Sequence, residues 1–482
     1  MGHAHPRAVV LSRFDLPDAA DLMVSSCEDC ACPVTGTAPV PPSAVPVEPD
    51  GVRWTRAAGT VESRLDDDHT LLFNPLGSYG VVVVNQAAYD IYAGGAADEA
   101  NTVLRTLASL DLVHPGGQPR RLVIAPSQVL TAWLHVTNGC NLRCPYCYVN
   151  KSAEPMDEAT GRAAVESVVR SAQAHGFRAV KLKYAGGEAS LNHRLVTTLH
   201  EYATELTASS GLRLEATLLS NGVRLPESLV QTCRDYGIRV MISLDGIGDS
   251  HDVQRPFASG RPSFRLVERT IAGLTSQGLA PHLSVTVTGR NAPGLPDVVQ
   301  FALDRDLTFS INLFRDNDCA ATAPDLRYEQ EQIIAALRAA FEVIERSLPR
   351  WSVLGSVLDR GQLLQPRQRS CGVGQDYVVI DQRGGVAKCH MEIERTLGDV
   401  FSADPLALVR HDRTSALNLL VEEKAGCREC TWRYWCSGGC SVATFRATGR
   451  YDVKSPNCDI YKAIYPEALR LEGLRLLRYA RA

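Results

Sequence analysis

No run of about 18 or more apolar residues occurs in the sequence, so we expect no membrane-spanning helix and no membrane partner. The N-terminus also lacks a basic region followed by an apolar core, which argues against a secretory signal and for a cytoplasmic location. Neither sign of charge is in excess, and the formal net charge of −4 gives no general attraction for DNA or RNA. With 482 residues, of which 45% are hydrophobic, the sequence indicates a globular chain of about two to four domains.

Cysteine is the unusual component, with 15 residues of which 12 fall in close groups. Cys233, Cys319 and Cys371 are the exceptions. Disulfides are rare in a reducing cytosol, where short cysteine spacings usually indicate metal binding or catalysis. We therefore expect metal centres.

The first two regions of the chain are small. Residues 1–50 contain Cys27, Cys30 and Cys32 and end in a linker over 33–50 that is rich in Pro, Ala and Val. Residues 51–120 combine β-rich runs with a helical pattern near residues 103–110. This pattern predicts a small α+β module, winged-helix-like, that contains a hairpin.

Residues 128–350 alternate strand-like runs with amphipathic helical stretches. The strands are expected at 130–136, 179–184, 212–219, 239–244, 281–287 and 308–313, and the main helices at 157–174, 194–208, 227–236, 264–277 and 295–303. This order predicts an α/β fold, a partial (β/α)6 TIM-like barrel, with chemistry at the C-terminal ends of its strands. A helix near 328–348 closes the barrel, and residues 365–482 form a cysteine-rich, loop-rich domain that ends in a helix over 463–482.

Cys140, Cys144 and Cys147 follow the first strand of the barrel with the spacing C-x3-C-x2-C. Three thiolates on one tight loop bind three irons of a cubane cluster and leave the fourth iron open to a small chelating molecule. A zinc site would need a fourth Cys or His nearby, and none lies within the next several residues. Structural cysteines are a poor alternative, because these alternate with polar and proline residues in a turn-rich segment.

This loop, with Tyr146 just before the last cysteine, resembles that of the radical S-adenosylmethionine (SAM) superfamily. The resemblance implies that the three cysteines bind a 4Fe-4S cluster whose open iron is chelated by the amino and carboxylate groups of SAM. It also implies that reductive cleavage of SAM gives a 5′-deoxyadenosyl radical, which removes hydrogen from a substrate. A one-electron reductant such as flavodoxin or ferredoxin is then the expected partner.

Further polar positions follow the strands where that family would contact SAM. Gly186, Gly187 and Glu188 resemble the motif that binds the SAM amino group: the glycines let backbone approach the ligand, and Glu188 accepts from the ammonium. The resemblance assigns other SAM contacts to Tyr146, Ser220, Asn221, Ser243, Asp245 and Arg255. An equal alternative is that Asp245, His251 and Arg255 serve the substrate, with Asp245 as a catalytic group, or merely cap the next helix.

Seven more cysteines lie between residues 371 and 458. A pair of zinc sites is the simpler interpretation. Their spacing nevertheless resembles the SPASM domain, which follows radical SAM cores that mature peptides and proteins. The resemblance implies two auxiliary clusters, both expected to be 4Fe-4S, and hence three iron-sulfur clusters in all: one on Cys427, Cys430, Cys436 and Cys458, and another on Cys371, Cys389 and Cys440.

The second auxiliary cluster has only three matched ligands. Either its fourth iron is open to substrate, or a distant residue such as Cys319 or one of the three N-terminal cysteines completes it. In sulfatase-maturing relatives an acidic residue that acts as base follows the cysteine equivalent to Cys389. His390 stands there in this chain, either as a catalytic base or as a hydrogen-bond donor to sulfur.

Residues 51–120 resemble, more loosely, the PqqD-like recognition element of ribosomally made peptide pathways, which binds a leader peptide as an added strand. We expect the run from Gly80 to Val84 to present the edge for that strand. The alternative is a cap that merely packs on the barrel. Cys27, Cys30 and Cys32 also leave two alternatives, a redox or metal role and a tail without fixed structure.

Together these expectations describe a radical SAM peptide maturase that acts on a ribosomally made precursor peptide with a leader. It would form a thioether or a carbon-carbon crosslink, with oxidation through the auxiliary clusters. One alternative is a related enzyme that modifies a protein side chain or a small molecule, like a sulfatase maturase. The other is a zinc-binding scaffold without catalysis.

Overall fold

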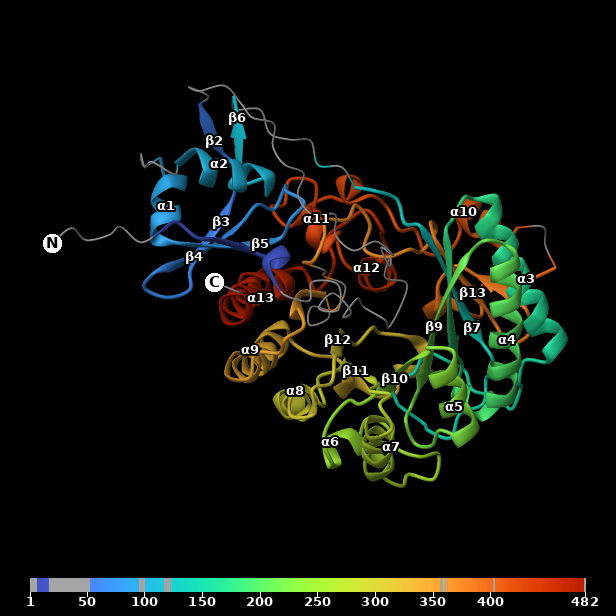
Figure 1. The fold of residues 1–482 in the computed structure, drawn as a ribbon. Helices are drawn as coiled ribbons and strands as arrows, with labels where there is room; N and C mark the ends of the chain where they lie inside the picture. Colours follow the sequence, from blue (N-terminus) through green and yellow to red (C-terminus); the bar gives the residue numbers. More distant parts are fainter. Residues whose placement is uncertain are drawn as a thin grey trace.

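Six parallel strands make up the larger part of a curved, nine-stranded sheet and extend to one of its edges (Figure 1). The computed structural model describes residues 7–16, 53–94, 100–116, 122, 124–355, 359, 361, 363–401 and 404–480. The six strands are β7 (Val129–His135), β8 (Ala179–Ala185), β9 (Arg213–Ser220), β10 (Arg239–Ser243), β11 (His282–Val287) and β12 (Phe309–Leu313). They lie side by side in chain order, and the mixed α/β fold with a parallel sheet is as predicted from the sequence.

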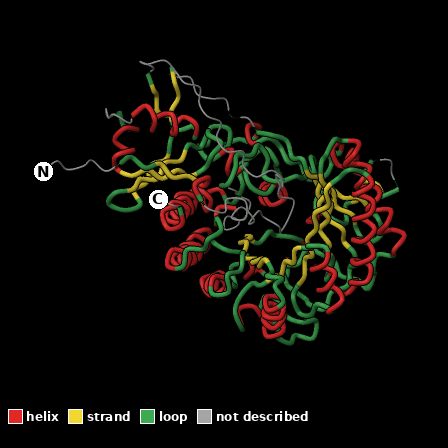
Figure 2. The backbone as a smooth tube through the Cα atoms, viewed as in Figure 1, coloured by secondary structure: helices red, strands yellow, loops and turns green. Residues whose placement is uncertain are grey.

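Helices cover the outer side of this sheet (Figure 2). They are α3 (Glu158–Ala174), α4 (His193–Ser209), α5 (Glu227–Asp235), α6 (Asp249–Asp252), α7 (Phe264–Ser276), α8 (Leu295–Leu303) and α9 (Gln330–Arg346). Because successive strand residues point to opposite faces, Leu130, Ala132 and Leu134 of β7 pack into the main apolar core. The residue between them, Trp133, belongs to a separate cluster on the opposite face.

That opposite face is polar, although it is buried. Lys181 and Lys183 on β8, Thr217 on β9 and Ser310 on β12 are each at most 1% exposed. Buried polar side chains are stable only where they find hydrogen-bond partners. This lining is typical of a barrel interior that receives polar groups, and it differs from a sealed apolar core.

The C-terminal region continues the same sheet. Its strands are β13 (Tyr377–Ile380), β14 (Gly385–Ala387) and β15 (Thr396–Asp399), and its helices are α10 (Pro405–His411), α11 (Arg433–Cys436), α12 (Ser441–Thr448) and α13 (Cys458–Tyr479). Strand β13 pairs in parallel with β7, and β14 and β15 follow in antiparallel order. The sequence predicted a loop-rich domain with a final helix and missed these strands, because strands of three or four residues are too short to show a periodicity.

The N-terminal module contains two small antiparallel sheets. Its elements are β1 (Val10–Ser12), β2 (Trp54–Arg56), β3 (Val61–Arg64), β4 (His69–Phe73), β5 (Val81–Asn85), α1 (Gln86–Tyr92), α2 (Ala100–Ser109) and β6 (Val113–Pro115). One sheet has the order β1-β5-β4-β3, and β2 pairs with β6 in the other.

Strand β5 does not present a free edge, so the prediction for residues 80–84 is wrong. It pairs with β4 on one side and with β1 on the other. Residues 7–16, which the sequence assigned to a separate N-terminal segment, therefore pack with the module. Cys27, Cys30 and Cys32 lie outside the described residues, and their role stays open.

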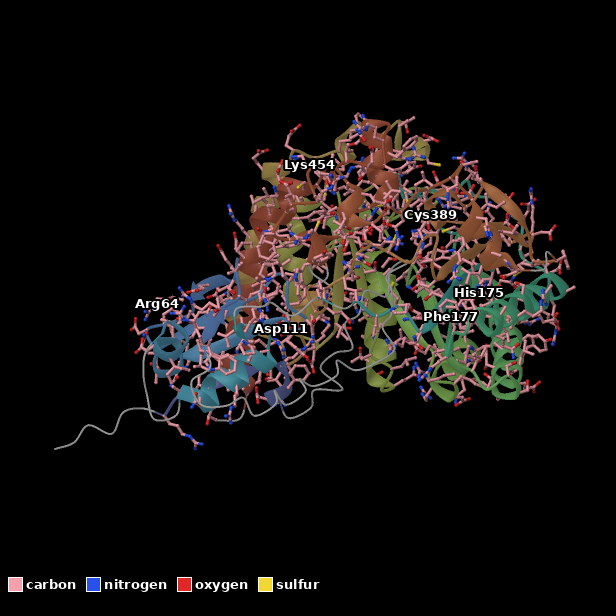
Figure 3. All side chains as sticks on the ribbon, turned by 90° about the horizontal axis from the view of Figure 1, so that it is seen from above. Arg64, Asp111, His175, Phe177, Cys389 and Lys454 are labelled. Atoms are coloured by element: carbon pink, nitrogen blue, oxygen red, sulfur yellow. The ribbon has the colours of Figure 1, made fainter. Side chains whose placement is uncertain are left out.

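The module packs directly on the C-terminal region. Phe73 of β4 contacts Trp432 and Trp435, with ring centroids 5.8 and 4.8 Å apart, and Trp435 Nε1 donates to Pro75 O over 2.8 Å. Gly473 of α13 lies so close to the module that a Cβ there would be 2.8 Å from Leu65 Cδ1. In Figure 3 the labelled residues Arg64 and Asp111 mark the module at one end of the molecule, and Cys389 marks the C-terminal region.

Among the described residues, we find no helix that combines the length and the apolar character needed to cross a bilayer.

Candidate active site

The loop after β7 brings three cysteines together. Burial raises the pKa of the Cys144 thiol to about 12, and nearby thiolate charges at Cys147 and Cys140 act in the same direction. Thiols of this kind ionise when a metal binds them, because the cation stabilises the thiolate. The donor set therefore suits a metal cluster, as the sequence suggested.

A backbone ladder fixes the shape of this loop. Arg143 N donates to Pro256 O over 2.9 Å, and Ala258 N donates to Asn141 O over 3.1 Å. Cys140 Sγ accepts from Leu142 N at 3.4 Å. The loop is thus positioned by the segment that follows β10, which also carries Arg255.

Gly186 and Gly187 lie directly against the cysteine loop. A Cβ at Gly187 would lie 2.4 Å from Gly139 O, and a Cβ at Gly186 would lie 2.5 Å from Thr137 O. Gly187 N donates to Thr137 O, and Glu188 N to Gly139 O, both over 2.8 Å. The glycines therefore let the backbone of the cysteine loop approach, and the approach of a ligand stays a prediction from the sequence.

Glu188 joins the ends of β8 and β9. Its Oε1 accepts from Ser220 Oγ at 2.8 Å and from Ser190 N at 3.1 Å, and its Oε2 accepts from Asn221 N at 2.6 Å. A carboxylate offers about four acceptor positions, so roughly one stays available for a ligand ammonium. Asn221 in turn donates to Asn141 Oδ1 over 2.7 Å, which ties this network to the cysteine loop.

A buried ion pair lies on the other side of the loop. Arg255 Nη1 is 3.3 Å from Asp245 Oδ2, and the Tyr146 hydroxyl hydrogen-bonds to both side chains. Asp245 Oδ1 also accepts from Thr286 N at 2.8 Å, and its side chain is fully buried. Asp245 is therefore paired with Arg255. This pairing argues against a role for Asp245 as a free catalytic carboxylate.

The helix-cap alternative for these residues is wrong. Asp252 Oδ1 accepts from Ser263 N and Phe264 N at 2.6 and 2.7 Å, so Asp252 caps α7. His251 instead accepts from Asp245 N at 3.3 Å through Nδ1. Burial lowers the pKa of His251 to about 3, so its ring is neutral.

These residues fit a cluster that carries SAM. Arg255 Nε is buried and has no hydrogen-bond partner among the described residues, so it offers a donor to a bound group near Cys144. Ser243 ends β10 at the same edge of the sheet and is half-buried. The predicted SAM contacts thus surround the cysteine loop.

The four cysteines assigned to the first auxiliary cluster line one small cavity. They are Cys427, Cys430, Cys436 and Cys458, and Trp432, Tyr461 and Tyr465 complete the wall. Cys458 begins α13, a helix that the sequence predicted to start five residues later at Ala463. Burial raises the pKa of Cys427 to about 11, and the charges of Cys436, Cys458 and Cys430 add to that effect.

Cys371, Cys389 and Cys440 form the other group. Burial raises the pKa of Cys389 well above its usual range, and charges at Cys440 and Cys371 act in the same direction. The side chain of Asn418 supports this group by donating to Cys371 O over 2.6 Å.

Lys424 lies between the two groups, and sequence reasoning missed it. Its ammonium is 1% exposed, donates to Ser437 O over 3.1 Å and interacts with Cys427, Cys371, Cys436 and Cys440. Gly438 leaves the room for it, since a Cβ there would be 2.6 Å from Lys424 Cδ. A single lysine before a cysteine gives no signal in the sequence, and only the fold shows this cation beside both groups.

His390 connects the barrel loop to the second group. Its ring stacks on Trp133 with centroids 4.8 Å apart and lies 5.5 Å from the ring of Tyr148, the residue after Cys147. His390 Nδ1 is 3.1 Å from the Tyr377 hydroxyl, and the residue is 7% exposed. This packing fixes the ring between Cys147 and Cys389.

Cys319 is placed beside the first cysteine loop. Its Sγ donates to Asn150 Oδ1 over 3.3 Å, and Cys147 is among the charges that raise its pKa. Its role as the fourth ligand of the second auxiliary cluster stays a prediction. In the described part of the chain all 12 cysteines are free thiols, and no set of three Cys, His, Asp or Glu side chains is arranged around a single ion.

Comparison with known proteins identifies the barrel. The profile of the Radical SAM superfamily matches residues 134–302, a range that includes the cysteine loop, Glu188 and Arg255. The chain contains a radical SAM domain. It is therefore an enzyme, and the radical SAM domain occupies the barrel described above.

Three curated proteins are similar to this chain in sequence. An uncharacterised protein of Methanocaldococcus jannaschii and the sporulation killing factor maturation protein SkfB of Bacillus subtilis are each 28% identical, over 171 and 172 residues. Those stretches cover 35% and 36% of this chain but only 57% and 39% of the relatives. PqqA peptide cyclase of Xanthomonas euvesicatoria is 25% identical over 353 residues, which cover 70% of this chain and 89% of the cyclase.

The fold also agrees with a solved structure. Native anSMEcpe with bound AdoMet and the Kp18Cys peptide aligns with a TM-score of 0.59 at 18% identity. The alignment covers 72% of this chain and 99% of that one. This likeness extends the shared fold beyond residues 134–302.

Proposed function

We propose that the chain is a peptide maturase that uses the radical SAM domain to form a thioether or carbon-carbon crosslink in a ribosomally made peptide. Two relatives support the substrate class, since one is named a maturation protein for a killing factor and the other a peptide cyclase. A cytoplasmic location belongs to the proposal, because thiols stay reduced there.

In this proposal Cys140, Cys144 and Cys147 hold the SAM-binding 4Fe-4S cluster. When bound, the cluster and SAM supply a carbon radical that abstracts hydrogen. Residues of the chain position SAM: Glu188 accepts from its ammonium, and Arg255 donates to the bound group. Gly187 lets the cysteine loop pack against the chain at the end of β8.

The C-terminal cysteines hold the two auxiliary clusters in this proposal. Lys424 offsets the negative charge of the thiolates on both sides, which favours reduction of the clusters. His390 and Tyr148 fill the space between the barrel loop and Cys389, and keep water out of it. Cys371, Cys389 and Cys440 leave one iron of their cluster without a ligand from this group, where a substrate thiolate would bind.

The observation that carries the peptide part is the pairing of β5. This strand accepts β1, a three-residue strand from a distant part of the sequence, as the edge of its sheet. Strand addition of this kind is a common mode of peptide recognition. The module is also fixed against the cysteine-rich domain through Phe73 and Trp435, so a strand paired with β5 lies on the same body as the cysteines proposed to hold the auxiliary clusters.

The test is anaerobic incubation of the reconstituted, reduced enzyme with SAM and a precursor peptide encoded beside its gene. We expect 5′-deoxyadenosine and a peptide that is lighter by two hydrogen atoms per crosslink, as measured by mass spectrometry. An unchanged peptide mass together with deoxyadenosine release would point to another substrate, such as a protein side chain or a small molecule. Zinc with little iron and sulfide in the purified protein would contradict the radical chemistry.

A further inference from the structure

The surface around the cysteine loop is rich in arginine. Four segments meet there: 139–147, which is the loop itself, 189–194 after β8, 221–226 after β9, and 256–263, which precedes α7. Each segment contains one arginine, which is exposed, and none contains Asp or Glu. The four arginines are Arg143, Arg194, Arg224 and Arg261. These segments therefore place positive charge beside the loop with no negative charge of their own.

Direct contacts join three of these segments to the cysteine loop. Asn221 Nδ2 donates to Asn141 Oδ1 over 2.7 Å, and Ala258 N donates to the backbone oxygen of the same asparagine over 3.1 Å. Leu191, which is 54% exposed, lies with its Cδ1 4.0 Å from the position of a Cβ at Gly139. In each case the arginine of the segment follows three residues later. An extended chain spans at most about 3.5 Å per residue, so each arginine backbone lies within roughly 11 Å of such a contact.

The four arginines have no carboxylate partner among the described residues. Arg143 Nη1 donates to two backbone carbonyls of its own loop, both over 2.8 Å, and Arg261 Nε donates to the Ser259 hydroxyl over 3.3 Å. Elsewhere on the barrel a surface arginine is paired, as Arg290 is with Asp325 at 2.7 Å. The charges beside the cysteine loop are therefore available to a separate acidic molecule.

An apolar groove between α5 and α7 continues this surface (Figure 1). Arg224 and Arg269 line it, and Arg265 is exposed one turn before Arg269 on α7. Glu268 of the same helix faces away to Arg305, at 3.9 Å. The apolar wall of the groove consists of Val223, Leu225, Val230, Leu266 and Leu274. An apolar centre with a polar rim is the usual composition of a protein interface. The groove and the six arginines at positions 143, 194, 224, 261, 265 and 269 form one arginine surface.

We propose that the arginine surface is the docking site of an acidic one-electron carrier protein of the flavodoxin class. This inference rests on the proposed function and gives the expected reductant its binding site. Unpaired arginines select an acidic partner, because complementary charge steers association. The position selects an electron carrier, since the surface adjoins the loop proposed to hold the SAM-binding cluster. A peptide substrate has to enter the interior of the barrel instead, where the polar side chains of β8 and β9 lie.

The step at this surface is the transfer of one electron. The anionic flavin hydroquinone of the carrier loses the electron and becomes the neutral semiquinone. The 4Fe-4S cluster proposed at Cys140, Cys144 and Cys147 is reduced by the same electron. No bond forms or breaks and no proton moves, so the carrier is the only reductant that the step needs.

Docking is tested by calorimetric titration of the reconstituted holoenzyme with oxidised flavodoxin. The test variant combines Arg224→Glu with Arg269→Glu, and we expect its dissociation constant to be at least about 10-fold higher than that of the wild type. Wild-type affinity should fall as NaCl is raised, and that of the variant should depend less on salt. The matched control combines Arg170→Glu with Arg178→Glu. It changes the net charge equally, and both arginines are exposed, on α3 and just before β8, toward the end of the sheet where the strands begin.

Electron delivery is tested by 5′-deoxyadenosine formation with two reductants. One is reduced flavodoxin, and the other is photoreduced deazaflavin, a small neutral molecule that needs no docking site. With flavodoxin, the variant with Arg224→Glu and Arg269→Glu should need at least about 10-fold more carrier to reach its half-maximal rate. With deazaflavin, the variant and the wild type should have equal rates, both of SAM cleavage and of peptide crosslinking.

Three outcomes would overturn the inference. Wild-type affinity for flavodoxin in the test variant would show that the carrier binds elsewhere. An equal loss of affinity in the control variant would make total charge the cause. Slower crosslinking with deazaflavin would make the peptide the occupant of the arginine surface. Absence of 5′-deoxyadenosine from the wild type with both reductants would instead refute the proposed function, and the titration would still test docking.

Discussion

Gly187→Ala is expected to reduce 5′-deoxyadenosine formation by about 100-fold or more, because it displaces the loop that carries Cys140. The added Cβ would lie 2.4 Å from Gly139 O and 2.8 Å from Asn138 O. Both contacts are with backbone atoms, so no side chain is able to rotate away. Anaerobic assay of the reconstituted variant by chromatography measures the effect.

Gly273→Ala is the matched control for this change. A Cβ at Gly273 meets no atom within 4 Å, and the residue lies inside α7. Alanine is favoured over glycine in a helix by roughly 0.5 to 1 kcal/mol, so this variant should keep full activity and gain slightly in stability. Wild-type rates in Gly187→Ala would show that the loop does not depend on its contact with β8.

Arg255→Met is expected to lower the free energy of unfolding by about 3 to 5 kcal/mol, because it leaves the Asp245 carboxylate buried without its cation. Asp245 is fully buried on its side chain, and Arg255 is 10% exposed. Urea unfolding of the apoprotein, followed by circular dichroism, gives this quantity.

A second substitution separates the effect of the unpaired Asp245 charge on stability from the effect of the altered side-chain shape at position 255. Adding Asp245→Asn to Arg255→Met removes the unpaired charge, so the double variant should recover part of the lost stability. The exposed Arg261 supplies the control, and Arg261→Met should change the free energy by less than about 0.5 kcal/mol. If Arg255→Met proved as stable as the wild type, the pair would have no structural role.

The sequence predicted the barrel well because its signals are local. Each of the six strands agrees within one residue, since β-rich runs alternate with long amphipathic helices. The loop with Cys140, Cys144 and Cys147 has a fixed spacing that needs no tertiary information. Gly187 was found for the same reason, although the sequence did not show its close contact with Gly139 of the cysteine loop.

Features that depend on distant pairing could not be predicted. Strand β1 has three residues and becomes a strand only because it pairs with β5, from which it is distant in sequence. Strand β13 likewise forms by pairing with β7, which lies far from it in sequence. Lys424 lies beside two groups of cysteines only after three chain segments, around Cys371, Cys427 and residues 436–440, have packed together.

The central claim is that the loop at residues 140–147 holds a cluster to which SAM binds. The most direct measurement is 5′-deoxyadenosine formation by the variant in which Cys140, Cys144 and Cys147 are all alanine. We expect no product above background, while the iron of the proposed auxiliary clusters is retained. SAM cleavage at the wild-type rate in this variant would contradict the account.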